Sequence, residues 1–123
     1  MARIMIADDS ESIRMVLRDI LSIGAHECTA EASNGFEAIE QFKKTFPDIV
    51  LLDMAMPKMD GLDVLKQMMS IRPAVRVIMI TASDDQNTIR DCIKEGASAY
   101  ILKPFNFQDV LNKINEVLSL RGA

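Results

Sequence analysis

The sequence predicts an α/β fold in which a parallel β-sheet is covered by helices on both faces. Two patterns in the 123 residues support this prediction. Short, nearly continuous apolar runs alternate with longer amphipathic segments, and most of these runs are followed at once by a polar side chain. Continuous apolar runs are typical of strands that are buried on both faces. Because strand and helix segments alternate throughout, one doubly wound domain is expected over residues 1–123.

Four of the five predicted strands consist almost entirely of apolar residues: 4–7, 49–52, 75–80 and 99–102. The remaining strand, residues 26–32, differs because small and polar residues alternate in it. The alternation places His26, Cys28, Ala30 and Ala32 on one face and Glu27, Thr29 and Glu31 on the other. Such a pattern is typical of an edge strand. With this strand at one edge, the order 2-1-3-4-5 fits, which is the flavodoxin-like arrangement.

The helical segments are predicted from apolar residues that recur three and four positions apart. The first helix shows this pattern at Ile13, Val16, Leu17, Ile20 and Leu21, with Ser10 as its expected N-cap and Gly24 at its end. The other four helices show it within residues 38–46, 62–69, 89–93 and 110–118. We expect Pro47 to end the second helix, Pro73 the third and Gly96 the fourth.

Polar side chains directly follow four of the predicted strands. Asp8 and Asp9 follow the first strand, Asp53 the third, Thr81 the fourth and Lys103 the fifth. In the order 2-1-3-4-5 the first and third strands are neighbours, and ligands bind at the carboxyl ends of such strands. We therefore expect the three aspartates to converge, with Thr81 beside them and Lys103 beyond. A single Asp after a strand is usually a turn former or a helix cap, so the prediction depends on the joint pattern.

Three neighbouring carboxylates must either bind protons or bind a cation. A site made of oxygen ligands, with room for water and phosphate, suits Mg²⁺. The Thr81 hydroxyl and the Lys103 ammonium group suit the oxygens of a phosphoryl group. The predicted sheet edge therefore has the groups that phosphoryl transfer needs, including a carboxylate as candidate nucleophile.

The composition restricts the class of protein further. Eighteen Asp and Glu residues outnumber 14 Lys and Arg residues, which gives a net charge of −4. A mildly acidic domain is a poor candidate for sequence-independent binding to nucleic acid or to an anionic membrane. No apolar run approaches the roughly 20 residues of a membrane span, so no membrane insertion is expected. The N-terminal segment meets acidic residues at Asp8 and does not resemble a targeting peptide, so we expect a cytoplasmic location.

Five short motifs contain or adjoin the polar residues at the predicted sheet edge. They are Ala7-Asp8-Asp9-Ser10, Leu52-Asp53-Met54-Ala55-Met56-Pro57, Met59-Asp60-Gly61, Ile80-Thr81-Ala82 and Leu102-Lys103-Pro104-Phe105. Together they resemble the motifs of response-regulator receiver domains of the stand-alone, CheY-like type, and the resemblance covers essentially the whole chain. This family is itself a known example of the order 2-1-3-4-5, so the strand order and the resemblance are not independent arguments.

The resemblance implies a role for each site residue. Asp53 would be the phosphoacceptor, Thr81 would donate its hydroxyl to the phosphoryl group, and Lys103 would pair with that group. Asp8, Asp9, Asp53 and the backbone carbonyl of Ala55 would hold Mg²⁺. Ala55 and Ser83 occupy positions that tune phosphate lifetime in the family, and the Lys103–Pro104 peptide bond is commonly cis.

The resemblance also implies a two-component signalling switch rather than a metabolic enzyme, because such a domain catalyses only its own phosphorylation and dephosphorylation. A sensor histidine kinase or a phosphorelay protein would donate the phosphoryl group. Thr81 and Tyr100 would form the switch, and a downstream protein, in the family often a chemotaxis target, would bind the face of the fourth helix, fifth strand and fifth helix. The expected contacts on this face are Ile89, Arg90, Lys94, Tyr100 and Phe107.

Other functions fit the sequence less well. A phosphatase of the haloacid-dehalogenase kind needs Asp-x-Asp after the first strand and usually a cap insertion, for which 123 residues leave no room. A flavodoxin-like flavin carrier needs aromatic residues around the flavin, whereas the chain has no Trp and one Tyr. A receiver that binds proteins without phosphorylation is disfavoured because the five site residues are intact. The chain ends after its last predicted helix, so a complete regulator and a receiver excised from a larger one both remain open.

Overall fold

The computed structural model describes residues 1–82 and 84–119, so Ser83 lies outside the described residues. Five parallel strands form one sheet in the order β2-β1-β3-β4-β5, as predicted. The strands are β1 (Arg3–Ala7), β2 (Glu27–Ala32), β3 (Ile49–Asp53), β4 (Arg76–Thr81) and β5 (Ala99–Leu102). The helices are α1 (Glu11–Ile23), α2 (Gly35–Thr45), α3 (Gly61–Ile71), α4 (Gln86–Lys94) and α5 (Phe107–Ser119).

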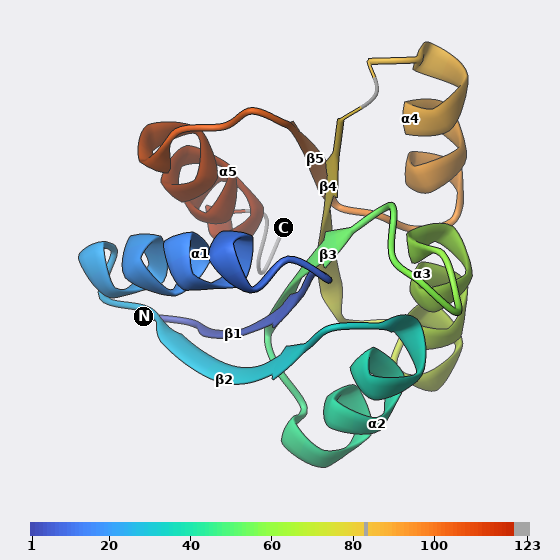
Figure 1. The fold of residues 1–123 in the computed structure, drawn as a ribbon, viewed down its shortest axis with the longest axis horizontal. Helices are drawn as coiled ribbons and strands as arrows, with labels where there is room; N and C mark the ends of the chain where they lie inside the picture. Colours follow the sequence, from blue (N-terminus) through green and yellow to red (C-terminus); the bar gives the residue numbers. More distant parts are fainter. Residues whose placement is uncertain (83, 120–123) are drawn as a thin grey trace.

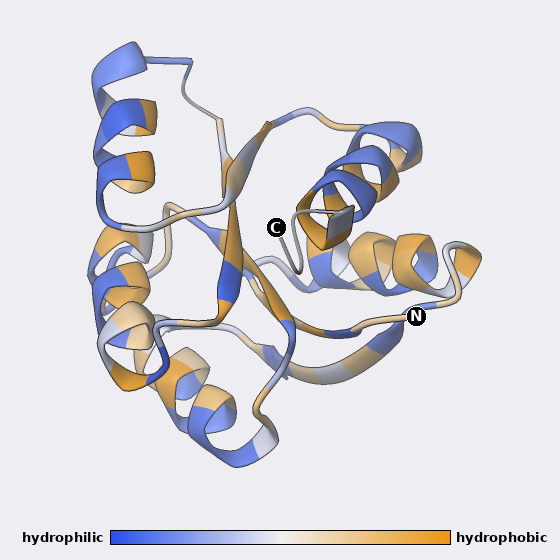
Figure 2. Ribbon diagram, turned by 180° about the vertical axis from the view of Figure 1, so that it is seen from behind, coloured by the Kyte–Doolittle hydropathy of each residue, from blue (hydrophilic) through white to orange (hydrophobic). Residues whose placement is uncertain are grey.

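The sheet separates two hydrophobic cores. Helices α1 and α5 cover one face, and α2, α3 and α4 cover the other (Figure 1). Within β3, Val50 and Leu52 belong to the core beneath α2 and α3, whereas Ile49 and Leu51 belong to the core beneath α1 and α5. Because both faces are covered, successive residues of a central strand must all be apolar, which explains the continuous runs in the sequence. Figure 2 shows these strands as hydrophobic and the outer faces of most helices as hydrophilic.

All five helices begin with a capping side chain in the loop that follows a strand; before α5, Asn106 accepts a hydrogen bond of 2.8 Å from the backbone N–H of Asp109. Ser10, Asn34, Asp60 and Asp85 each accept a hydrogen bond from a backbone N–H in the first turn of α1, α2, α3 and α4, respectively. These bonds satisfy N–H groups that have no partner within the helix. The caps therefore hold the loops at the carboxyl edge of the sheet, where the predicted site lies. None of the helices in the described part of the chain combines the length and apolar character needed to cross a membrane.

The edge strand β2 departs from the predicted alternation. Ile4 of β1 pairs with Cys28, but the next residue, Met5, pairs with Ala30, so Thr29 is an extra residue in a β-bulge. Cys28 consequently packs against the core of α1 and α5, whereas Ala30 packs against the opposite core. The prediction that Cys28 and Ala30 share a face was therefore wrong. The bulge also places Glu31 on the side of α1, where it meets two arginines of that helix.

The first residue of α3 lies against the end of β3, and this contact predicts the effect of a substitution. A Cβ atom at Gly61 would lie 2.5 Å from the carbonyl oxygen of Asp53 and 2.7 Å from the Cα atom of Met54. Neither backbone atom can rotate away, so Gly61→Ala should lower the free energy of unfolding by about 1–3 kcal/mol in urea denaturation. Ser70→Ala, at an exposed position of the same helix, serves as the control and should change it by less than about 0.5 kcal/mol. Equal stabilities of the two variants would contradict the close-packing argument.

Candidate functional site

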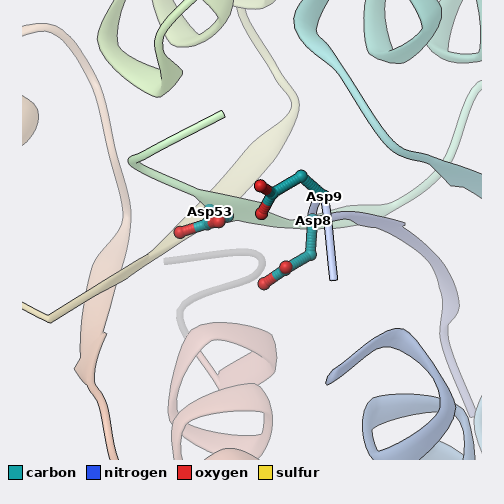
Figure 3. A group of neighbouring side chains, drawn as sticks. All are labelled: Asp8, Asp9 and Asp53. Atoms are coloured by element: carbon teal, nitrogen blue, oxygen red, sulfur yellow. The ribbon is translucent and has the colours of Figure 1, made fainter. Parts of the chain in front are cut away.

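The three aspartates come together at the carboxyl edge of the sheet. Asp8 and Asp9 follow β1, Asp53 ends the neighbouring strand β3, and one carboxylate oxygen from each residue lies within 4.8 Å of the other two (Figure 3). Asp8 and Asp53 are buried, with 1% and 3% of their surface exposed, whereas Asp9 is exposed. The cluster therefore has a buried floor and one side open to solvent.

Lys103 is the cation of this cluster. Its Nζ atom lies 3.3 Å from Oδ1 of Asp53 and 3.4 Å from Oδ2 of Asp8. The side chain reaches the site from the end of β5, across β4, and the Lys103–Pro104 peptide bond is cis, as the resemblance implies. Lys103 thus lies between two buried carboxylates rather than beyond them. One ammonium group cannot neutralise three carboxylates, so the ionised cluster keeps two negative charges.

The environment of Asp53 disfavours its charged form. Burial raises the pKa of the Asp53 carboxyl above its usual value, and the nearby Asp8 carboxylate raises it further. The charge and hydrogen bond of Lys103 act in the opposite direction, as does the N–H of Ala55, which donates to Oδ1 at 3.3 Å. Because the first two effects are the stronger, ionised Asp53 lacks sufficient positive charge around it.

The Asp8 carboxylate is also incompletely compensated, because only one of its two oxygen atoms accepts a hydrogen bond from a described residue. Its Oδ1 atom accepts a hydrogen bond of 2.9 Å from the N–H of Ser10, but Oδ2 accepts none from any described residue. Oδ2 has only the ion pair with Lys103, although it is buried. A buried carboxylate oxygen without a hydrogen bond is costly. An all-oxygen cluster of this charge, open on one side to water, fits a hard divalent cation such as Mg²⁺.

A pocket adjoins Asp53 on the side of β4. Its volume is about 340 Å³, and Asp53, Thr81 and Lys103 line it together with Met54, Ala55, Ala82 and Thr88. Thr81 is the last residue of β4 and is buried, with 6% of its surface exposed. The structure therefore places Thr81, Lys103 and the Asp53 carboxylate at one pocket. This pocket has room for a phosphoryl group. Thr88, in the first turn of α4, gave no signal in the sequence, because hydroxyl side chains are common near helix N-termini.

Tyr100 lies on β5, next to the strand that carries Thr81. Its ring is half-buried and packs against the core beneath α2 and α3. It also lines a surface pocket of about 500 Å³, whose other walls come from the end of β5 and from α5. In the register of the two strands, Thr81 pairs with Leu102, two residues after Tyr100. The two predicted switch residues thus belong to adjacent strands, with Tyr100 paired to Met79, two residues before Thr81.

The face of α4, β5 and α5 exposes most of the side chains expected there. Arg90, Lys94 and Phe107 are exposed, but Ile89 is buried, with 8% of its surface exposed. The expectation that Ile89 contacts a partner was therefore wrong, because α4 turns this residue inward. Besides the expected Phe107, Ile93 and Leu102 contribute exposed apolar side chains to this face.

One residue near the cluster was missed by the sequence analysis. The Nη1 atom of Arg14 donates a hydrogen bond of 2.7 Å to the backbone carbonyl of Asp8, and its Nε atom donates to Glu31 at 3.1 Å. The periodicity of α1 places Arg14 beside the apolar face of the helix but does not indicate its partners. Glu31 reaches it only because of the bulge in β2, which no local pattern predicts.

Comparison with known proteins identifies the family. A model of the response regulator receiver domain matches residues 4–115. The chain therefore belongs to the response-regulator receiver domains, the signalling switches of two-component systems. It is similar to the chemotaxis protein CheY of Bacillus subtilis, with 42% identity over 95% of this chain and 98% of the relative. CheY of Thermotoga maritima is 40% identical over 94% of this chain and 96% of its own length.

A solved structure supports the same assignment. The crystal structure of the CheX-CheY-BeF3-Mg²⁺ complex from Borrelia burgdorferi contains a chain that matches the present structure with a TM-score of 0.92. The sequence identity is 34%, and the match covers 94% of this chain and 88% of that chain. The doubly wound fold with its order 2-1-3-4-5 is thus the fold of the family.

The raised pKa of Asp53 predicts a pH-dependent penalty on folding without metal. A carboxyl whose folded pKa exceeds its unfolded pKa destabilises the fold increasingly as the pH rises from the unfolded value, about 3.9, through the folded value. Above that range the penalty is fully present. In EDTA at pH 7, Asp53→Asn should therefore raise the free energy of unfolding by about 1 kcal/mol, and the gain should vanish below the unfolded pKa.

Urea unfolding over a series of pH values measures this effect. Asp19→Asn, at an exposed position of α1, is the control, and it should change the stability by less than about 0.5 kcal/mol at every pH. An Asp53→Asn variant that is no more stable than the wild type at pH 7 would contradict the electrostatic account of the cluster.

Proposed function

We propose that this receiver domain accepts a phosphoryl group on Asp53 and thereby switches the face formed by α4, β5 and α5. The observation that carries the proposal is the setting of Asp53, a buried carboxylate that faces a pocket and contacts Lys103 at 3.3 Å. The domain would act on itself rather than turn over a metabolite, because the acceptor is its own side chain. The donor would be a sensor histidine kinase or a phosphorelay protein that carries phosphohistidine.

In the proposed step an oxygen of the Asp53 carboxylate forms a bond to phosphorus as the bond from phosphorus to the donor imidazole nitrogen breaks. The imidazole keeps the electron pair of that bond and takes up a proton, so the products are an acyl phosphate on Asp53 and a free histidine. Lys103 would move from the carboxylate to the phosphoryl oxygens and balance their charge. Thr81, at the same pocket, would donate its hydroxyl to another of these oxygens.

Asp8, Asp9 and Asp53 would hold one Mg²⁺, with the backbone carbonyl of Ala55 as a further ligand. When bound, the ion supplies positive charge that stabilises the phosphoryl oxygens during transfer. The buried Oδ2 atom of Asp8, which lacks a hydrogen bond from the described residues, supports this assignment, as does the exposure of Asp9 on the open side. The similar structure from Borrelia burgdorferi is a complex with BeF3 and Mg²⁺, a pairing that fits the same chemistry.

The phosphoryl group would act on the output face through Thr81 and Tyr100. Drawing the Thr81 hydroxyl toward phosphate would vacate space beneath α4 and favour a more buried Tyr100, by at most a few kcal/mol. The face itself combines apolar side chains, Ile93 and Phe107, with the cations Arg90 and Lys94. This combination suits an amphipathic, partly acidic helix of a protein partner. Two of the similar proteins are chemotaxis proteins, and a chemotaxis target is the partner we favour.

The phosphoacceptor assignment can be tested with acetyl phosphate and Mg²⁺ in place of a kinase. Mass spectrometry should find one acid-stable, base-labile phosphate on Asp53. Asp53→Asn should abolish labelling, and Asp9→Asn should slow it because one ligand of the metal loses its charge. Asp63→Asn, an exposed aspartate of α3, is the control and should label like the wild type. Phosphate on another residue, or normal labelling of Asp53→Asn, would refute the assignment.

The coupling to the output face can be tested by NMR with beryllofluoride as a stable phosphate mimic. In the wild type, backbone shifts should change in α4 and around Tyr100 as well as in the loops near Asp53. Thr81→Ala should still bind the mimic but show much smaller changes in α4 and at Tyr100. Thr88→Ala, which removes another hydroxyl from the same pocket, is the matched control and should behave like the wild type. Changes confined to the Asp53 loops in the wild type would mean that this face is not the output.

A further inference from the structure

The loop that carries Asp8 and Asp9 is held from outside the acidic cluster by a guanidinium group. Arg14 extends from α1, and its side chain is only 16% exposed. Its Nη1 atom donates to the carbonyl oxygen of Asp8 at 2.7 Å, and its Nε atom donates to Oε1 of Glu31 at 3.1 Å. One planar group thus joins the backbone of Asp8 to the edge strand β2, in the manner for which arginine is suited.

The bonded carbonyl belongs to the peptide unit between Asp8 and Asp9. A peptide unit is planar, so fixing its oxygen also fixes the direction in which the Asp9 Cα atom leaves Asp8. The N–H of Asp8 donates to the carbonyl of Ala32 at 3.0 Å, which completes the attachment of Asp8 to β2. The exposed side chain of Asp9, in contrast, has no hydrogen bond to any described residue. Its position relative to Asp8 therefore depends on the backbone that Arg14 holds.

Glu31 is in turn held by a second arginine. Its Oε2 atom lies 2.5 Å from Nη1 of Arg18, so each carboxylate oxygen of Glu31 binds a different arginine of α1. The more exposed Arg18, with 41% of its side chain accessible, orients Glu31 and does not contact the acidic loop. Arg14 and Arg18 thus share one partner, but only Arg14 touches the Asp8 backbone, which provides a matched pair for an experiment.

We propose that Arg14, held by Glu31, is a positioning residue for the divalent cation. It would keep the Asp8–Asp9 peptide oriented so that both carboxylates face Asp53 despite their mutual repulsion. The inference rests on the proposed function, because it assumes that the three aspartates bind Mg²⁺. A purely structural role, in which Arg14 only ties α1 to β2, predicts lower stability but the same Mg²⁺ affinity in the folded protein.

The test is a Mg²⁺ titration of the folded protein followed by NMR of the backbone amides of Asp9, Asp53 and Ala55. Arg14→Gln should weaken Mg²⁺ binding by roughly 10-fold, the usual lower limit for losing a group that orients metal ligands. Glu31→Gln should act in the same direction, less strongly. Arg18→Gln, the matched control, should bind Mg²⁺ within about twofold of the wild type, because its contribution reaches the loop only through Glu31. Arg14→Lys keeps the charge but cannot serve both acceptors, so it should also weaken binding.

A second readout separates positioning from loss of fold. In labelling by acetyl phosphate, Arg14→Gln should raise the Mg²⁺ concentration for half-maximal rate while the maximal rate at saturating Mg²⁺ stays within about twofold. A lower maximal rate at an unchanged half-saturation would assign Arg14 a structural role and overturn the inference. Wild-type affinity in Arg14→Gln or Arg14→Lys, or an equal loss in Arg18→Gln, would overturn it as well. If the wild type itself shows no saturable Mg²⁺ binding, the proposed function fails and this inference fails with it.

Discussion

Two carboxylates, Asp8 and Asp53, are buried side by side with one ammonium group between them, and much of the fold serves to keep them there. The strand register makes the juxtaposition unavoidable, because Ala7 of β1 pairs with Leu52 of β3 and each is followed directly by an aspartate. Like charges in a buried setting repel strongly, yet the strands cannot separate, since apolar cores on both faces hold them. The resulting deficit of positive charge favours the binding of a cation. It also makes the electrostatic balance of the site sensitive to any change in the charge of Asp53.

The strands next to β3 connect the charged cluster with the surface formed by α4, β5 and α5. Asp53 ends β3, Thr81 ends the next strand and Tyr100 lies on the strand after that, so three neighbouring strands connect the proposed phosphoacceptor with the proposed output face. Conversion of a carboxylate to an acyl phosphate adds up to about one negative charge and three acceptor oxygens within this short span. Among the helices of the described residues, α4 buries the fewest side chains, Ile89 and Cys92, so the proposed phosphorylation would displace it with the least loss of apolar packing.

The sequence predicted those features that repeat or that follow from topology. Continuous apolar runs identified four strands. The polar residues that directly follow these runs identified the candidate site residues, Asp8, Asp9, Asp53, Thr81 and Lys103. The features it did not predict depend on single residues or on distant partners. An extra residue at Thr29 reverses the faces of half a strand, and no local pattern distinguishes it from regular alternation. The inward rotation of Ile89 and the contact of Arg14 with the Asp8 backbone likewise depend on how the helices pack, which periodicity alone leaves undetermined.

The bulge in β2 also affects the free edge of the sheet, which β2 forms. An edge strand presents N–H and C=O groups to which another chain could add a strand, and proteins avoid such pairing with irregular registers and charged side chains. Thr29 interrupts the regular spacing in the middle of β2, and the exposed Glu27 places a charge at its start. An incoming strand would have to match a kinked ladder and accommodate a carboxylate. Thr29, the extra residue that turns Glu31 toward α1, therefore also disfavours edge-to-edge pairing of another chain with β2.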